Sequence, residues 1–251
     1  MEIEGDEFYK QASELSNDKS LVLFNKAVIK YLASRSYLKA ADTFCKIAEL
    51  HVENGNINSA AFCLKKAGEY YTDVDNIAFE ICFKESIKLF VHDYKYINAA
   101  RTSEILAHTF AMQSVNSYEQ AYNYYHMNGL ITEGINCLSK AIDILVGQEQ
   151  YEPANKCLLI IFSHLDMNSP DKASKIIFQI GIIKLYLKNV GECRLWLNMC
   201  KIYNKYKDYI LLNDLIDAYE KFNKKLFVEI MDQCGLERWE KKLLLKIKAL
   251  M

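Results

Sequence analysis

The stretch YLKAADTFCKIAELHVE, residues 37–53, decides the fold class, because its apolar side chains return every three or four positions. This spacing is typical of an amphipathic α-helix. The same periodicity runs through the rest of the chain, and no segment shows the two-residue alternation of a half-buried strand. We therefore expect an all-α protein. The stripe in this stretch consists of Leu38, Ala41, Cys45, Ala48 and His51 or Val52.

Short polar or glycine-containing segments interrupt the pattern, which predicts about 14 helices joined by links of about two to five residues. Gly and Asn after a helix suit a left-handed cap, and Pro170 suits the first turn of the next helix. The expected breaks are Ser34–Ser36, Asn54–Asn56, Asp73–Asp75, Ser114–Ser117, Gly147–Gln150, Asn168–Pro170 and Asn189–Gly191. We also expect either a shortened helix or a tight turn near Asn128–Gly129.

Many of the expected helices share one or two small residues, often with a tyrosine or isoleucine three positions earlier. The signature recurs at intervals of about 20 residues, so one helical hairpin takes about 40. Small side chains let helices approach closely, and a hairpin cannot bury its apolar face alone. We therefore expect a right-handed solenoid of antiparallel helical hairpins, similar to tetratricopeptide repeats, over residues 1–205, and a C-terminal helical bundle or cap over residues 206–251. The clearest copies are Tyr37…Ala40–Ala41, Ile57…Ala60–Ala61, Tyr96…Ala99–Ala100, Tyr118…Ala121, Ile131…Gly134 and Tyr151…Ala154.

The composition excludes several classes of protein. Of the 251 residues, 51% are hydrophobic and 25% are charged, which indicates a folded globular chain rather than a disordered one. The formal charge of −1 gives no bulk attraction to nucleic acid or anionic lipid. The longest apolar run, Cys157 to Phe162, is far too short to span a bilayer. Because no segment reads as a signal peptide and no cysteine pair has C-x-x-C spacing, we expect free thiols and a cytoplasmic location.

No motif supports catalysis. The sequence lacks the phosphate-binding, dinucleotide-binding, zinc-protease and nucleophile-elbow motifs. The five histidines are dispersed without metal-ligand spacing, and carboxylate pairs such as Glu49/Glu53 fall on faces that should be solvated. We therefore expect a protein that binds partners rather than an enzyme, with no catalytic residue, no metal, no cofactor and no nucleic-acid partner.

Two cations hold equivalent places in the repeat, since Arg101 follows Ala99–Ala100 and Lys156 follows Ala154–Asn155. Equivalent positions of a solenoid line one strip. We expect these two side chains and Lys95 to share a face that suits an extended acidic partner. Spacing alone leaves open the alternative that they are scattered over a solvated surface.

The C-terminal stretch LERWEKKLLLKIKALM, residues 236–251, combines an apolar stripe with a basic back. Such a segment fits a docking helix, a helix on a membrane surface or the cap of a solenoid. The preceding residues 209–235 carry five acidic and three basic side chains, and this opposite charge favours the cap.

Seven stretches in order resemble the soluble NSF attachment protein (SNAP) family, the alpha form more than the gamma form. They are KAADTFCKIAELH (39–51), NSAAFCLKKAGEYY (58–71), NAARTSEIL (98–106), GINCLSKAIDIL (134–145), YEPANKCLL (151–159), LLNDLIDAYEKFN (211–223) and GLERWEKKLLLKIK (235–248). The resemblance implies an adaptor at the membrane periphery. Several copies of it would bind one assembled SNARE complex, an acidic four-helix bundle, and recruit the hexameric AAA ATPase NSF, which disassembles that bundle.

The resemblance also implies roles for individual residues. SNARE binding falls on Lys95, Arg101 and Lys156, and NSF binding falls on Asp217, Glu220 and Leu250. Family members carry a longer N-terminal loop with exposed phenylalanines that touches the membrane, whereas here the link is only about Ser16–Lys19. Membrane contact would then fall to Leu21, Leu23 and Phe24. We expect these three residues and Val22 on the buried side of the second helix. The alternative from another class is a scaffold subunit that binds a peptide or helix of a complex without SNAREs.

Overall fold

The computed structural model describes residues 1–15, 18–72, 74–109, 114–165, 169–232 and 235–251. Within these ranges every regular element is helical, and the 14 α-helices confirm the all-α prediction. The chain divides into two compact units, Met1–Cys137 and Leu138–Met251, which are described separately. The division expected between residues 205 and 206 stays a prediction.

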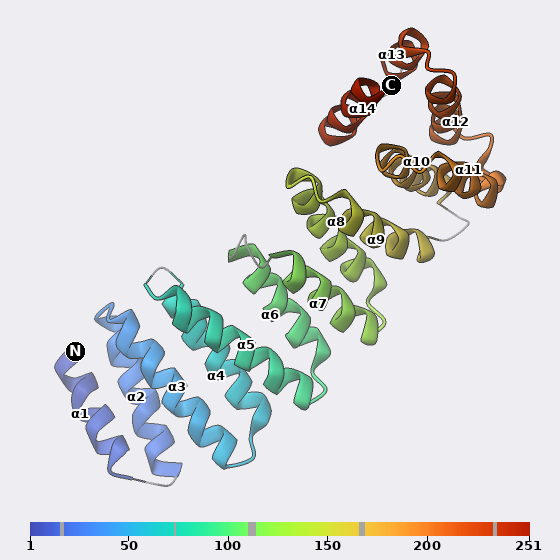
Figure 1. Ribbon diagram of the computed structural model, residues 1–251. Coiled ribbons are helices and arrows are strands. Elements are labelled where there is room, and N and C mark those ends of the chain that lie inside the picture. The colour runs from blue at the N-terminus through green and yellow to red at the C-terminus, as the bar shows by residue number, and fades with distance from the viewer. Residues whose placement is uncertain (16–17, 73, 110–113, 166–168, 233–234) are drawn as a thin grey trace. The chain divides into compact units, whose positions relative to one another are not determined.

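Unit 1 is a row of helices in which each packs on the next one along the chain. Figure 1 shows α1 to α7 side by side and alternating in direction, which confirms the expected stack of hairpins. The helices are α1 (Glu2–Ser13), α2 (Asp18–Ala33), α3 (Tyr37–Glu53), α4 (Ile57–Tyr71), α5 (Asn76–His92), α6 (Tyr96–Thr109) and α7 (Ser114–Met127), followed by α8 (Ile131–Gly147), which crosses the unit boundary.

The small residues of the repeat lie where helices approach each other. Ala60, Ala61, Ala99 and Ala100 are each 0% exposed. At Gly68 on α4, an added Cβ would lie 2.4 Å from the ring of Phe83 on α5. The spacing of neighbouring helices in unit 1 therefore depends on side chains no larger than a methyl group.

Seven links within the described ranges share one construction, three residues with the middle one at positive φ. In the link after α7, the Gly129 N–H donates to the His126 carbonyl and the Leu130 N–H donates to the Tyr125 carbonyl, as in a Schellman motif. This confirms the tight turn at Asn128–Gly129 and the breaks at Ser34–Ser36 and Asn54–Asn56. The residues at positive φ are Arg35, Gly55, Tyr94, Gly129, Glu149, Lys188 and Phe222.

One expected break is wrong. Ser114 and Ser117 are buried in the first turn of α7, so Ser114–Ser117 is helix rather than link. Serine satisfies backbone groups equally well at a helix start and in a loop, so it does not separate the two by itself. Two other expected breaks and the N-terminal link fall partly outside the described residues, at Asp73, Asn168 and Ser16. The described part of the first of these contains Asp75, whose carboxylate accepts hydrogen bonds from two N–H groups at the start of α5.

Unit 2 is organised around α10, which packs against α9, α11, α12 and α14. Residues 177–183 of α10 are all buried, as expected of a helix surrounded by others. The elements that follow α8 are α9 (Tyr151–Ser163), α10 (Pro170–Tyr186), α11 (Val190–Met199), a 3₁₀ turn (Lys201–Tyr203), α12 (Lys207–Glu220), α13 (Lys224–Asp232) and α14 (Arg238–Leu250).

Candidate functional site

Lys95 and Arg101 lie at the start of α6 in unit 1, and both side chains are exposed. Lys95 ends the link before α6, where its N–H donates to the Phe90 carbonyl at 2.8 Å. Arg101 follows two alanines that are 0% exposed, so burial of the alanines turns Arg101 toward solvent. Neither cation forms an ion pair with another residue in the described ranges. Both charges are therefore available to a partner.

Arg101 lies within electrostatic reach of α7. The Tyr125 hydroxyl donates to Glu104 Oε2 at 2.7 Å. Burial raises the pKa of the Tyr125 phenol above its usual range, the hydrogen bond to Glu104 adds to this, and the charge of Arg101 acts in the opposite direction. A positive charge thus lies beside a hydrogen-bonded pair that joins α6 to α7.

Lys156 repeats this local arrangement on α9 in unit 2. It lies two positions after Ala154, which is 0% exposed, and its own side chain is exposed. Arg101 stands at the same offset from Ala99, so the equivalence of the two cations within their helices is confirmed. The single strip predicted for Lys95, Arg101 and Lys156 stays a prediction, because Lys156 belongs to the other unit.

Asp217 and Glu220 lie one turn apart on α12, and both bind the guanidinium of Arg194 on α11. Arg194 Nη2 contacts Asp217 and lies 2.6 Å from Glu220 Oε2, and Nη1 donates to Asn213 Oδ1 at 3.0 Å. The hydrogen bond with Glu220 holds the pKa of Arg194 above its already high usual value. The family resemblance pointed to the two carboxylates, but the sequence gave no signal for Arg194.

This arrangement changes the charge that the C-terminal acids present. Asp217, Glu220 and Arg194 together carry a net charge of about −1 at neutral pH. The chain then turns at Phe222 and continues with Lys224 and Lys225, of which the second has a side chain 90% exposed. The surface around the two acids is therefore of mixed sign rather than strongly negative.

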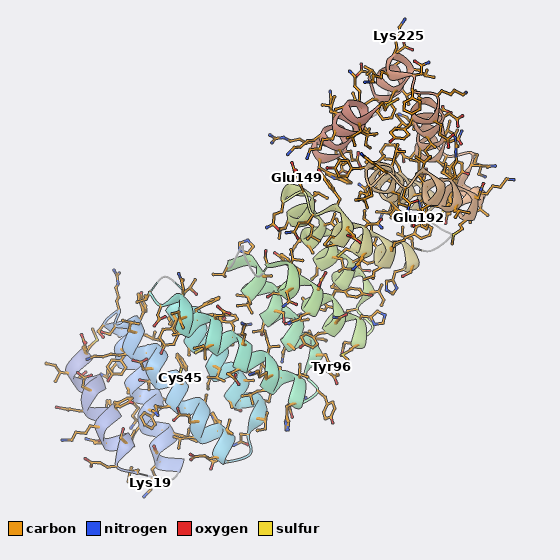
Figure 2. All side chains as sticks on the ribbon, in the orientation of Figure 1. Lys19, Cys45, Tyr96, Glu149, Glu192 and Lys225 are labelled. Atoms are coloured by element: carbon orange, nitrogen blue, oxygen red, sulfur yellow. The ribbon has the colours of Figure 1, made fainter. Side chains whose placement is uncertain are left out.

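The C-terminal helix α14 is held to unit 2 by ionic contacts at two places. Glu240 is 0% exposed, and its carboxylate accepts from Lys175 Nζ at 2.8 Å and Gln179 Nε2 at 2.9 Å, both on α10. Glu149, labelled in Figure 2 in the link before α9, binds Lys242 at 2.7 Å and Lys246 at 2.5 Å. Hydrogen bonds from these two lysines lower the pKa of Glu149 to about 2.

Leu250 is the last residue of α14 and is 46% exposed. It borders an open hollow of about 510 Å³ that Tyr186, Leu187 and Ala249 also line. The apolar stripe earlier in the helix points inward, with Leu243, Leu244 and Ile247 each 0% exposed. The stripe thus packs in the core of unit 2, and its role as a cap of the solenoid stays a prediction.

The three residues considered for membrane contact lie on α2 of unit 1. Phe24 is 4% exposed, and its ring meets that of Tyr9 edge to face with centroids 5.2 Å apart. Leu21 and Leu23 are partly buried against the same cluster. The expected burial is confirmed for these three residues and is wrong for Val22, which is 56% exposed. Phe24 could reach a membrane only by leaving this core. Membrane contact here stays a prediction.

The described residues contain neither a membrane-spanning helix nor a candidate metal site. No helix there is both long and apolar enough to cross a bilayer. No group of three or more His, Cys, Asp or Glu side chains there could hold a metal ion. The seven cysteines that lie in the described ranges are all free thiols, as expected.

Comparisons with known proteins address the chain as a whole. Residues 7–251 match the family described as "Soluble NSF attachment protein, SNAP". The beta-soluble NSF attachment protein of Bos taurus is 21% identical over 250 residues, which cover 92% of this chain and 83% of that protein. The alpha-soluble NSF attachment proteins of Mus musculus and Homo sapiens are also 21% identical, over 260 and 256 residues with the same coverage. Since the family match spans nearly every residue and the fold is the expected row of helical hairpins, this chain belongs to the soluble NSF attachment protein family.

Proposed function

We propose that this protein is an adaptor that binds assembled SNARE complexes and recruits the ATPase NSF for their disassembly. The observation that carries the proposal is the family match over residues 7–251. Relatives named as NSF attachment proteins align with 92% of this chain, so the proposal concerns the whole molecule rather than one segment.

The exposed cations support the SNARE side of the proposal. Lys95, Arg101 and Lys156 are exposed, and none forms an ion pair within the described ranges. A single exposed charge pair contributes only about 0.2–1 kcal/mol. Capture of an acidic bundle therefore requires several such contacts, and binding of several copies to one bundle would multiply them. Because exposed charges are screened by salt, this capture should weaken as ionic strength rises.

On the NSF side, the proposed contacts are Asp217, Glu220 and Leu250. Arg194 fixes both carboxylates in place, and Leu250 is the exposed apolar end of a helix that is itself anchored in unit 2. We propose that the ATPase meets a rigid surface of mixed charge here.

The test of the SNARE contact is a double charge reversal. Arg101→Glu combined with Lys156→Glu should abolish pull-down of assembled SNARE complexes at low salt and leave the circular dichroism spectrum unchanged. Lys10→Glu combined with Lys172→Glu is the matched control, because it makes the same change of net charge at exposed lysines, one in each unit. Undiminished capture by the first variant, or equal loss by both, would reject these residues as the SNARE contact.

The alternative function, a scaffold that holds a peptide or helix of another complex, predicts no salt-sensitive SNARE capture and no response to NSF. An NSF disassembly assay with this protein as the sole added adaptor separates the two functions. Release of SNARE subunits that depends on ATP and on this protein supports the adaptor, and absence of release favours the scaffold.

A further inference from the structure

Two cysteines 37 positions apart in the sequence meet in the core of unit 1. Cys45 Sγ on α3 lies 3.7 Å from Cys82 Sγ on α5. Cys45, labelled in Figure 2, is partly buried, and Cys82 is 5% exposed. Both helices pack against α4, which lies between them in the chain. The pair thus joins a partly buried cysteine to a buried one.

We propose that Cys45 and Cys82 form a peroxide-reactive thiol pair, in which Cys45 is oxidised first and Cys82 then converts it to a reversible disulfide between α3 and α5. This modification site goes beyond the adaptor function and does not depend on it.

The surroundings of the two sulfurs assign their roles. The hydrogen bond between the two thiols lowers the pKa of Cys45, although burial and the nearby Asp42 carboxylate act in the opposite direction. The pKa of Cys82 is raised, first by the same hydrogen bond and then by burial. Because the thiolate is the reactive form of cysteine, Cys45 is the residue that attacks an oxidant.

The chemistry balances with a hydroperoxide as the oxidant. The Cys45 thiolate attacks one oxygen of hydrogen peroxide, the O–O bond breaks, and the released hydroxide takes up the proton that Cys45 gave up, forming water. The Cys82 sulfur then attacks the Cys45 sulfenic acid, the S–O bond breaks, and the hydroxyl leaves with the Cys82 proton as a second water. Two thiols lose two electrons and two protons, and one peroxide becomes two waters.

Formation of the bond requires the sulfurs to close from 3.7 Å to about 2.0 Å. The disulfide would close a loop that contains the whole of α4, and it would join α3 covalently to α5. Closing such a loop restricts the unfolded chain. The oxidised protein should therefore unfold at a temperature up to about 10 °C higher than the reduced protein.

Cys63 on α4 provides a matched reference in the same unit. It is also partly exposed, and burial raises its pKa to about 11. The thiolate fraction of Cys45 is thus larger, and its lower intrinsic nucleophilicity offsets only part of that advantage. Cys45 should react with peroxide at least about tenfold faster than Cys63.

The test treats the full, reduced chain with hydrogen peroxide, quenches it with an alkylating reagent and maps the peptides by mass spectrometry. The expected product is a Cys45–Cys82 peptide that dithiothreitol reverses. Cys63→Ser should form the same product. Cys82→Ser and Cys82→Ala should instead stop at a Cys45 sulfenic acid that dimedone traps, and should not show the rise in unfolding temperature.

Three results would overturn the proposal. One is oxidation of Cys45 no faster than that of Cys63. Another is a disulfide that joins Cys45 to Cys63 or to a second molecule instead of to Cys82. The last is rapid oxidation of Cys82 in Cys45→Ser, since the buried sulfur should not react with peroxide by itself.

Discussion

Glu240→Ala tests whether one buried carboxylate holds the C-terminal helix to unit 2. Glu240 is 0% exposed and accepts three hydrogen bonds. Lys175 Nζ and the Glu237 N–H lie 2.8 and 2.9 Å from Oε2, and Gln179 Nε2 lies 2.9 Å from Oε1. The substitution removes the acceptor of all three bonds and leaves the donors in place.

The expected loss in the free energy of unfolding depends on what happens to the donors that lose their acceptor. Breaking a fully buried ion pair costs about 3–5 kcal/mol, because the surviving charge stays buried. The Lys175 side chain is 29% exposed and can turn toward water, so the lower part of this range applies. Gln179 is 7% exposed and keeps only the longer contact with Glu237 Oε1 at 3.5 Å, so its weakened amide hydrogen bonding costs about 1 kcal/mol. Since these contributions overlap, we expect a loss of about 3 kcal/mol in the free energy of unfolding of unit 2.

The assay is urea denaturation of the full chain followed by tryptophan fluorescence. Both tryptophans, Trp196 and Trp239, lie in unit 2, so the signal reports that unit alone. Glu229→Gln is the control, because this carboxylate is 53% exposed and 3.9 Å from its lysine partner, and its loss should change the free energy by less than about 0.5 kcal/mol. A loss below about 1 kcal/mol for Glu240→Ala would refute the reasoning, since it would mean that desolvation of the charge cancels its hydrogen bonds.

Two further predictions concern unit 2. The pKa of Glu149 is depressed to about 2, so its ion pairs with α14 stabilise the fold fully above about pH 5 and are lost as the pH falls toward 2. The urea midpoint of unfolding should fall over this pH range in the wild type and should fall much less in Glu149→Gln. An equal fall in both proteins would contradict this prediction. Gly181→Ala should cost about 1–3 kcal/mol, because its Cβ would lie 2.2 Å from Leu212 Cδ2. At Gly191 an added Cβ meets no atom within 4 Å, so Gly191→Ala should be neutral or slightly stabilising. Equal thermal unfolding midpoints of the two variants would contradict this difference.

The sequence predicted the helices because the signal is local. A helix that buries one face must repeat small or apolar residues every three or four positions, and Ala60 and Ala99 show this directly. The turns were predicted where Gly55 or Gly129 supplies the left-handed residue. They were missed where Tyr94 or Phe222 adopts the same conformation, because packing of the flanking helices imposes a backbone shape that the residue does not favour.

The features of the candidate site also fall into two groups, local ones that the sequence predicted and non-local ones that it did not. Exposure of Arg101 and Lys156 was predictable, since each stands two positions after a buried alanine in its helix. The pairing of Arg194 with Asp217 and Glu220 was not, because residues 23 and 26 positions apart meet only through the packing of α11 on α12. The approach of Cys45 to Cys82 is non-local for the same reason.

The two proposed binding surfaces therefore attract their partners by different means. Arg101 and Lys156 have no ion-pair partner within the described ranges, so each offers a full charge but must lose side-chain freedom when a partner binds. Asp217 and Glu220 have already lost that freedom, because Arg194 holds both, but it also cancels about half of their charge. The two exposed cations can each attract an acidic bundle from a distance, whereas the two held carboxylates offer fixed geometry at contact. An adaptor that must first find a spent complex and then hold an ATPase in a defined orientation needs a surface of each kind.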